Sequence, residues 1–423
     1  MGLTNGVWNA RIPAAKSQAH LSDGTLGVAL FAVPAGLVIG AVLAERLVDR
    51  VGSARVARAS GLGVCAALVT PGLAGTLPGL MAGLFALGVC SGTVDVASNA
   101  QGVRVEAAYG RPVMSLMHAF YSLGAIFGSL AGAGFATAGV TLLPSLAAAA
   151  AVSTAIVAVA GRWLLPEAPA PDKGRADPGS GRPGPPSGPR PAAAGPDGPS
   201  PDSPSPDSRS QDGPSPDSRR QVRRLVIALG LLGICGLVGE GAAGDWSAVY
   251  LRDNLGTSAG VAALAYAAFS VTMTVGRAVG DPLIRRFGVV RVIRGGGVAA
   301  TAGFALALAT PSPAATIAGF LAVGAGLSVV VPQVFAAGGR ADPGRPGSGL
   351  AKVVGLGYTG LTAGPAVIGL AASRIGLRLA LLIPLVLAGW IVAVAPVLRA
   401  RPPGPAAASG VTGASGSNTQ PFG

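Results

Sequence analysis

Two basic stretches decide the fold of this chain: ERLVDRVGSARVAR at Glu45–Arg58 and DPLIRRFGVVRVIR at Asp281–Arg294. An offset of 236 residues, from position 45 to position 281, superimposes their Arg-x-Gly-x-x-Arg cores. The same ungapped offset pairs glycines far outside these stretches: Gly40 with Gly276, Gly83 with Gly319, Gly88 with Gly324 and Gly128 with Gly364. An offset that holds over so much of the chain indicates an internal repeat, with two halves of the same orientation.

The basic stretches lie between long apolar segments. A helix that spans a bilayer needs about 20 mostly apolar residues. Segments of this kind cover residues 24–46, 56–74, 78–100, 112–136, 140–165, 224–250, 259–282, 290–310, 313–337, 348–372 and 376–399. Charged residues make up 12% of the chain, against about 25% in soluble domains, and the mean hydropathy is +0.57. The composition excludes a typical soluble enzyme and a disordered chain, and it predicts an all-α, polytopic membrane protein.

The first residues, Met1–Ala10, are apolar but reach across only half a bilayer. We interpret them as the outer half of a first helix whose beginning is missing, with Asn5, Asn9 and Arg11 at its end. This helix brings the expected number of spans to twelve, six in each half. We expect an N-terminal bundle over residues 1–165, a disordered Pro/Gly/Ser linker over 166–222, a C-terminal bundle over 223–400 and a disordered tail over 401–423.

The net charge of +13 is spread in short bursts between the apolar segments. Nucleic-acid binding is not expected, because no basic domain with interleaved aromatic residues occurs. Most of the 31 Lys and Arg residues fall on one side of the predicted topology, and Arg277 lies inside a span. Because basic loops stay in the cytoplasm, the linker, the two basic stretches and the C-terminus are expected to be cytoplasmic, in a protein of the cell membrane.

Motifs for cofactors and for common enzyme chemistry are missing from the sequence. No P-loop, H-E-x-x-H or G-x-S-x-G motif occurs. The G-x-G-x-x-G pattern at Gly355–Gly360 lies inside an apolar span without a preceding strand, so we interpret it as a site of close helix packing. The three cysteines have no metal-binding spacing. We therefore expect neither an enzyme nor a bound metal or cofactor.

The basic stretches resemble the loop motif G-x-x-x-D-R-x-G-x-x-R of the major facilitator superfamily. The first copy matches at Asp49, Arg50, Gly52 and Arg55, with Glu45 in place of the motif glycine. The second copy matches at Arg286, Gly288 and Arg291, with Asp281 and Arg285 in the glycine and aspartate positions. The resemblance implies two parallel six-helix bundles, and it implies that these residues (the gate motif) steady a cytoplasmic gate by charge pairing.

Four further segments resemble a narrower group, the MosC/YbjJ-like branch of bacterial inner-membrane permeases. They are WNARIPAAK, DVASNAQ, YGRPVMSLMHAFYSLGA and GDWSAVYLRD, which begin at Trp8, Asp95, Tyr109 and Gly244. MosC-like members are associated with rhizopine, an inositol-type compound. The resemblance thus implies a permease and gives only an analogy for its substrate.

Three ionisable residues lie deep inside the predicted spans and are candidates for proton coupling: Asp95, His118 and Glu240. Asp95 and His118 are expected at the same depth in the membrane, in neighbouring helices. They therefore either form a proton site or hold the two helices together by a hydrogen bond. Glu240 lies among glycines, where it either binds a proton or a cationic group, or forms a structural pair.

Polar residues elsewhere in the spans are candidates for contact with a solute. In the superfamily that this chain resembles, the first, fourth, seventh and tenth helices line a central cavity. Asn5, Asn99 and Gln333 would lie on those helices. The hydroxyls of Tyr121 and Tyr358 need partners inside their spans. Trp246 is either an interface residue or a platform for substrate.

These features predict a secondary active transporter that moves a small polar solute by alternating access. Without an ATPase motif, an H⁺ or Na⁺ gradient is the expected drive. A solute of sugar or inositol size suits the modest polar lining, and we expect a monomer in the lipid bilayer. The alternatives are a sensor or scaffold that keeps the fold without transport, an efflux protein for drugs or metabolites, and a polytopic membrane enzyme.

Overall fold

The computed structural model describes residues 1–110, 114–165, 216–341 and 346–399. Helices account for the regular structure of these residues, and no strand occurs among them. The expected tail at 401–423 and most of the expected linker at 166–222 lie outside the described residues. Residues 216–222, at the end of the expected linker, form the first turns of a helix instead.

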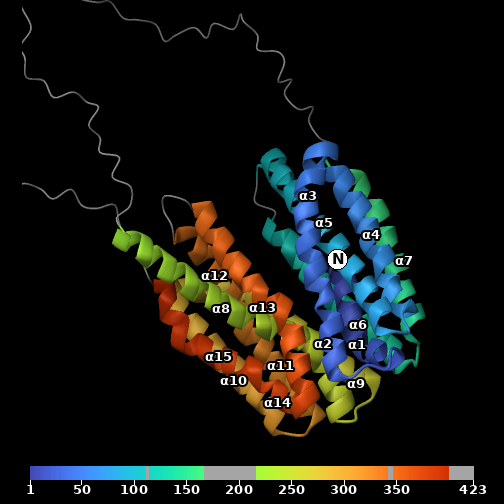
Figure 1. Ribbon diagram of the computed structural model, residues 1–423. Helices are drawn as coiled ribbons and strands as arrows, with labels where there is room; N and C mark the ends of the chain where they lie inside the picture. Colours follow the sequence, from blue (N-terminus) through green and yellow to red (C-terminus); the bar gives the residue numbers. More distant parts are fainter. Residues whose placement is uncertain (111–113, 166–215, 342–345, 400–423) are drawn as a thin grey trace, which may run out of the picture.

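Within the described residues, the N-terminal half has seven α-helices (Figure 1). They are α1 (Gly2–Gln18), α2 (Asp23–Leu30), α3 (Ala32–Val51), α4 (Ser53–Leu73), α5 (Leu77–Tyr109), α6 (Met114–Thr137) and α7 (Leu142–Ala160), followed by the short turn η1 (Gly161–Trp163). Helix α1 continues through Pro13 to Gln18, so the expectation that Asn5, Asn9 and Arg11 end the first helix is wrong. Proline at this position weakens a helix without forcing it to end, because packing against neighbouring helices holds the backbone.

The C-terminal half repeats this arrangement. It contains α8 (Pro216–Val249), the π-helical turn η2 (Tyr250–Asn254), α9 (Ala259–Phe287), α10 (Val289–Ala309), α11 (Pro313–Leu327), α12 (Val330–Arg340), α13 (Pro346–Ile375), α14 (Leu377–Ala380), α15 (Leu382–Val394) and the short turn η3 (Ala395–Arg399). Eleven helical segments in the described residues are long and apolar enough to cross a membrane, and they correspond to the predicted spans. With α1, they form the expected fold of twelve helices.

Three spans in the described part of the chain are broken, and a proline follows each break. The α2–α3 break at Phe31 precedes Pro34, the α11–α12 break at Ser328 precedes Pro332, and the α14–α15 break at Leu381 precedes Pro384. Proline has no backbone N–H, and its ring crowds the carbonyl four residues earlier. A helix therefore loses the hydrogen bond to the carbonyl four residues before each proline, next to the observed break.

Backbone geometry confirms the internal repeat. Gly52 joins α3 to α4 with φ 90° and ψ 147°, and Gly288 joins α9 to α10 with φ 81° and ψ 148°. The offset that aligns these turns also aligns two helix contacts. A Cβ atom on Gly88 would overlap the carbonyl oxygen of Val33, and a Cβ atom on Gly324 would overlap that of Phe269. The two halves therefore use the same turns and the same close helix packing.

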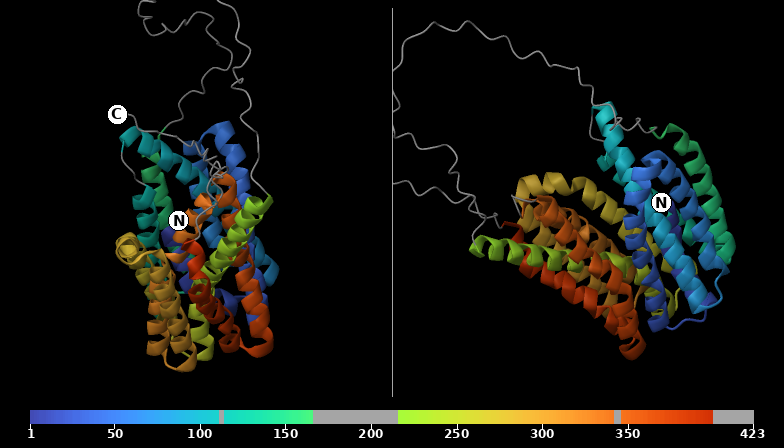
Figure 2. Two further views of the ribbon diagram at one scale, coloured as in Figure 1. Left: turned by 90° about the vertical axis from the view of Figure 1, so that its left-hand side faces the viewer. Right: turned by 45° about the horizontal axis from the view of Figure 1, so that its top comes forward.

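The halves meet at one end and separate towards the other, as Figure 1 and the right-hand view of Figure 2 show. We call the end where they meet the closed end; there α2 packs on α13 and α6 packs on α9. A Cβ atom on Gly27 of α2 would lie 2.8 Å from the Cα atom of Gly369 in α13. We call the opposite end, which carries the Gly52 and Gly288 turns, the basic end. In Figure 1 the basic ends of the two halves lie well apart.

The turn glycines give a first prediction. Gly52→Ala and Gly288→Ala place a Cβ atom in a backbone conformation that L residues rarely adopt, at a cost of about 1–3 kcal/mol each. We expect each variant to unfold at a lower temperature in detergent, as measured by intrinsic fluorescence. Gly295→Ala is the control, because a Cβ atom at this helical site meets open space. Equal unfolding temperatures for all three variants would contradict the strain argument.

Candidate functional site

An ion pair lies in the middle of the C-terminal half. Glu240 of α8 and Arg277 of α9 approach each other, with Arg277 Nη2 3.3 Å from Glu240 Oε2. The Glu240 side chain is 20% exposed and the Arg277 side chain is 39% exposed. The sequence pointed to Glu240 and placed Arg277 inside a span, but it did not indicate that the two residues pair, because they lie on different helices. Each residue supplies the counter-charge that a buried ion in a membrane needs.

The N-terminal half presents polar groups towards this pair. Asn5 Nδ2 of α1 donates a hydrogen bond to the hydroxyl of Tyr121 in α6, at 2.7 Å. Tyr121 lies within the electrostatic field of Asp95, Glu240 and Arg277. In α13, Tyr358 feels the charges of Asp95 and Glu240. Charged and hydroxyl groups of both halves therefore lie near one another midway along the helices.

We call these six residues the central polar cluster: Asn5, Asp95, Tyr121, Glu240, Arg277 and Tyr358. Four of the six lie on α1, α5, α8 and α9, and the two tyrosines lie on α6 and α13. Phe335 of α12 supports the Tyr358 ring edge to face, with ring centroids 6.3 Å apart. The cluster thus contains two carboxylates, one guanidinium, one amide and two phenol groups, which can bind a polar molecule and can hold or release a proton.

The other residues predicted for the site lie in several places. Asn99 is half-buried, one turn after Asp95 on α5. Gln333 is half-buried at the start of α12, just after Pro332. Asp95 has interactions of its own, but the side chain of His118 lies outside the described part of the structure, so the pairing of these two residues stays a prediction. Trp246 is fully buried in the core, and its role as a contact for solute stays a prediction.

A second polar group lies between the central polar cluster and the closed end. The hydroxyl of Tyr266 in α9 lies close to the side chains of Asn9 and Ser270, and Asp245 of α8 lies near it. Gly244 of α8 lets Asn9 of α1 approach, because a Cβ atom there would lie 3.1 Å from Asn9 Nδ2. We call Asn9, Asp245, Tyr266 and Ser270 the polar roof. The repeat offset of 236 residues relates Asn9 to Asp245. Two polar residues at equivalent positions of the two halves are a signal from which the polar roof could have been predicted.

A pocket of about 250 Å³ lies elsewhere, inside the N-terminal half. Residues of α1, α4, α5 and α7 form its walls, which are mostly apolar and include Arg58, Ser98 and Ser153. None of the residues predicted for the site lines this pocket. The central polar cluster is therefore the candidate site.

Two glycines allow the halves to touch at the closed end. A Cβ atom on Gly24 of α2 would lie 2.9 Å from the Cβ atom of Ser373 in α13, and one on Gly260 of α9 would overlap the side chain of Thr137 in α6. The repeat offset relates Gly24 to Gly260 and Thr137 to Ser373. We call these two contacts the glycine seam. Each glycine packs against a small hydroxyl residue of the other half.

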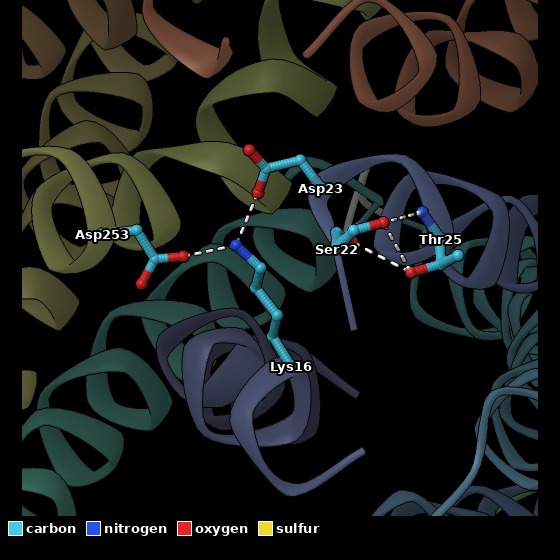
Figure 3. A network of polar contacts seen from close by, with 5 residues as sticks. All are labelled: Lys16, Ser22, Asp23, Thr25 and Asp253. Atoms are coloured by element: carbon cyan, nitrogen blue, oxygen red, sulfur yellow. Dashed lines mark hydrogen bonds and ion pairs between the residues drawn. The ribbon is translucent and has the colours of Figure 1, made fainter. Parts of the chain in front are cut away.

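An ion cluster also joins the halves at this end (Figure 3). Lys16 Nζ, in the last turn of α1, lies 2.5 Å from Asp23 Oδ1 at the start of α2. The same ammonium group binds Asp253 in η2 of the C-terminal half. Ser22 orients this corner by capping α2, since its hydroxyl accepts a hydrogen bond from the N–H of Thr25. Lys16 is 14% exposed, so part of its charge is shielded from water and the ion pairs are stronger than exposed ones.

The gate motif lies at the basic end, where its charged side chains are exposed: Asp49, Arg50, Arg55, Asp281, Arg285, Arg286 and Arg291. Arg55 donates to the carbonyl of Val51 at 3.2 Å, and Arg286 lies over the ring of Phe287. Among the described residues, no ion pair joins the members of this motif to one another. Gly52 and Gly288 form the turns described above.

The glycine seam gives a second prediction. Gly260→Val should push α9 away from Thr137 and open the closed end, because the contact has no room for a side chain. In a background without the three native cysteines, Asn9→Cys should then react faster with a bulky thiol reagent added on the closed-end side. Gly134→Val is the control, since position 134 has open space, and Thr137→Gly should reverse the effect of Gly260→Val. Unchanged labelling in Gly260→Val would disprove the seam's role.

The ion cluster gives a third prediction. Lys16→Gln leaves Asp23 and Asp253 as neighbouring like charges, and the loss of about 1 kcal/mol of attraction should raise the labelling of Asn9→Cys about fivefold. Lys352→Gln, a change at an exposed lysine of α13, should leave the labelling unchanged. High salt should weaken the ion pairs, so the difference in labelling rate between Lys16→Gln and the parent protein should become smaller. Equal labelling at low salt would show that the cluster does not hold the halves together.

Comparisons with known proteins agree with this architecture. The Major Facilitator Superfamily profile matches residues 1–338. An uncharacterised transporter of Sinorhizobium fredii, y4wD, is 31% identical over 398 residues, which cover 94% of this chain and 95% of that protein. The membrane protein MosC of Rhizobium meliloti is 29% identical over 405 residues, covering 95% of this chain and 88% of MosC.

A solved structure has the same fold. The nucleoside transporter NupG superimposes with a TM-score of 0.63 at 13% identity, and the match covers 94% of this chain and 96% of that one. The similarity to MosC agrees with the branch expected from the sequence segments. By its profile match over most of its length, its relatives and its fold, the chain belongs to the major facilitator superfamily.

Proposed function

We propose that this protein is a secondary active transporter that moves a small polar solute across the membrane by alternating access. The observation that carries the proposal is the central polar cluster, in which the Glu240–Arg277 pair lies near Tyr121 of the other half. The halves touch at the closed end and separate at the basic end. A solute bound at this cluster would be reached from the basic end in this conformation. The relatives that are named as transporters support the same function.

The charge distribution supports an orientation. Basic loops remain in the cytoplasm, and the basic end carries Arg50, Arg55, Arg286 and Arg291. The basic end would then face the cytoplasm, and this conformation would be open inwards. In the outward-open conformation the glycine seam would part and the basic ends would meet, so that Asp49 could pair with arginines of the gate motif. The linker and the C-terminus would also be cytoplasmic.

Coupling to an ion gradient is assigned to the carboxylates of the central polar cluster. Glu240 is the first candidate, because Arg277 lies 3.3 Å away and can stabilise its charged form until a proton arrives. Asp95, together with His118, is the second candidate. Either site can carry H⁺, and a carboxylate can also bind Na⁺. A transporter of this kind needs neither an enzymatic active site nor a cofactor, and it can work as a monomer.

Glu240→Gln gives a fourth prediction. The amide keeps the size of the side chain and cannot lose a proton, so gradient-driven accumulation in proteoliposomes should be abolished. Exchange of solute for solute should continue, because it needs no net movement of protons. The solute for the assay is one that raises the unfolding temperature of the purified protein in a screen of small polar compounds.

Asp217→Asn is the matched control, since Asp217 lies on the same helix in its exposed first turn. Wild-type accumulation by Glu240→Gln would remove Glu240 from the coupling site and leave Asp95 as the candidate. Binding without any solute exchange by the wild-type protein would favour a sensor over a transporter.

A further inference from the structure

We propose that the solute is an anion: a small polyhydroxy compound whose carboxylate binds Arg277 and displaces Glu240 from it. This inference rests on the proposed transport function and specifies the class of its substrate. It is carried by the geometry of the Glu240–Arg277 pair, by the free donors of Arg277 and by the hydroxyl groups that face them.

Arg277 is placed where a cation is costly unless an anion accompanies it. It lies ten residues before the end of α9 at Phe287, about 15 Å along the helix. A charge at this depth in a membrane protein is retained for function or paired with an opposite charge. Arg277 therefore has to keep an anionic partner throughout a transport cycle. Glu240 supplies that partner in the conformation described here.

The contact with Glu240 uses only part of the guanidinium group. One nitrogen, Nη2, lies 3.3 Å from Oε2 and 3.5 Å from Oε1. These distances are long for a charge-assisted hydrogen bond, and a bidentate contact would use two nitrogens. Nε and Nη1 have no partner among the described residues, and the side chain is 39% exposed. An arriving carboxylate can thus bind the unused edge of Arg277 with better geometry than Glu240 has.

Groups across the interface suit the hydroxyls of such a solute. The phenol of Tyr121 already accepts a hydrogen bond from Asn5 and can still donate its own proton. Tyr358 presents a second phenol, which lies in the field of Asp95 and Glu240. A sugar acid or a hydroxy acid could place its carboxylate on Arg277 and its hydroxyls on these two phenols, and so contact both halves at once.

Anion binding and protonation of Glu240 are then linked. A bound carboxylate and a charged Glu240 would repel each other beside a single cation, so the solute should bind more tightly when Glu240 carries a proton. Besides Arg277, the titratable groups near Glu240 are Tyr121 and Tyr358, and Asp95 lies near both of these phenols. Helices α11 and α15, which also pack on α8, contain no charged residue. One proton and one anion would move together.

The alternative class is a cationic solute that binds Glu240 and Asp95. It would have to separate Glu240 from Arg277 and leave Arg277 beside the bound cation, which is unfavourable. The repeat offset places Thr4 opposite Glu240 and Ala41 opposite Arg277, so the N-terminal half offers no second copy of the pair. The cationic class is kept as an outcome of the test.

The test measures how matched compounds stabilise the purified full-length protein against heat. The panel pairs D-gluconate with D-glucitol, D-glucuronate with D-glucose, and lactate with 1,2-propanediol, and it adds D-glucosamine as a cation. We expect at least one carboxylate to bind at least tenfold more tightly than its neutral partner. The same carboxylate should bind more tightly at pH 5.5 than at pH 8. Glu240→Gln should bind it at pH 8 as the parent does at pH 5.5.

The role of Arg277 is tested in the Glu240→Gln background, so that removing Arg277 does not leave the Glu240 carboxylate unpaired. Arg277→Gln alone leaves Glu240 unpaired, so the double variant Glu240→Gln/Arg277→Gln is compared with Glu240→Gln. The double variant should lose anion binding at least tenfold and keep its unfolding temperature without solute. Glu240→Gln/Arg277→Lys should fall between the two, because lysine keeps the charge but loses the planar fork.

Three results would overturn the anion assignment. The first is that no carboxylate in the panel stabilises the protein more than its neutral partner does. The second is that the double variant still binds the carboxylate as tightly as Glu240→Gln does, and the third is that D-glucosamine stabilises the protein more than the carboxylates do. If D-glucosamine or a neutral compound is then exchanged in proteoliposomes, transport stands and the anion class fails. If a carboxylate binds through Arg277 but is not exchanged, the anion site stands and the proposed transport function fails.

Discussion

Close approach of helix backbones at glycine is the interaction on which this structure depends. Helices in a bilayer gain little from hiding apolar side chains against one another, because lipid is equally apolar, so their association relies on tight packing. Gly88 against Val33 and Gly324 against Phe269 bring the backbones of neighbouring helices into contact within each half. At the closed end, Gly27 of α2 and Gly369 of α13 do the same between the halves. With side chains at these positions, the helices would have to lie farther apart.

Polar groups of the spans have different surroundings. Thr93 bonds the carbonyl of Gly40 and Arg11 bonds that of Val140, and both contacts lie within the N-terminal half. Glu240 and Arg277 need each other because the membrane interior penalises a lone charge. Their 3.3 Å contact leaves most donors of Arg277 unused. A site of this kind is stable when empty and still has capacity for a ligand.

Much of this architecture could be predicted from the sequence, because its signals are local. Apolar segments of sufficient length indicated the eleven spans, and the basic stretches around Gly52 and Gly288 indicated the repeat. Partners across the fold could not be predicted in this way. Lys16 and Asp253 lie on different halves, and their pairing depends on how those halves dock. Hydropathy also gave no sign that α1 continues past Pro13 or that Trp246 is buried in the core.

The glycine seam makes this single chain comparable to a homodimer. Its two contacts, Gly24 with Ser373 and Gly260 with Thr137, are the same pair of positions used in reverse order, which is the property of an isologous interface. In a true homodimer every mutation appears at both contacts. Here the two copies are encoded separately, so each contact can change alone. The Lys16 cluster has a basic residue at its repeat-related position, 252, but no carboxylate at the positions related to its two aspartates. It is a place where the two sides of the interface have already become different.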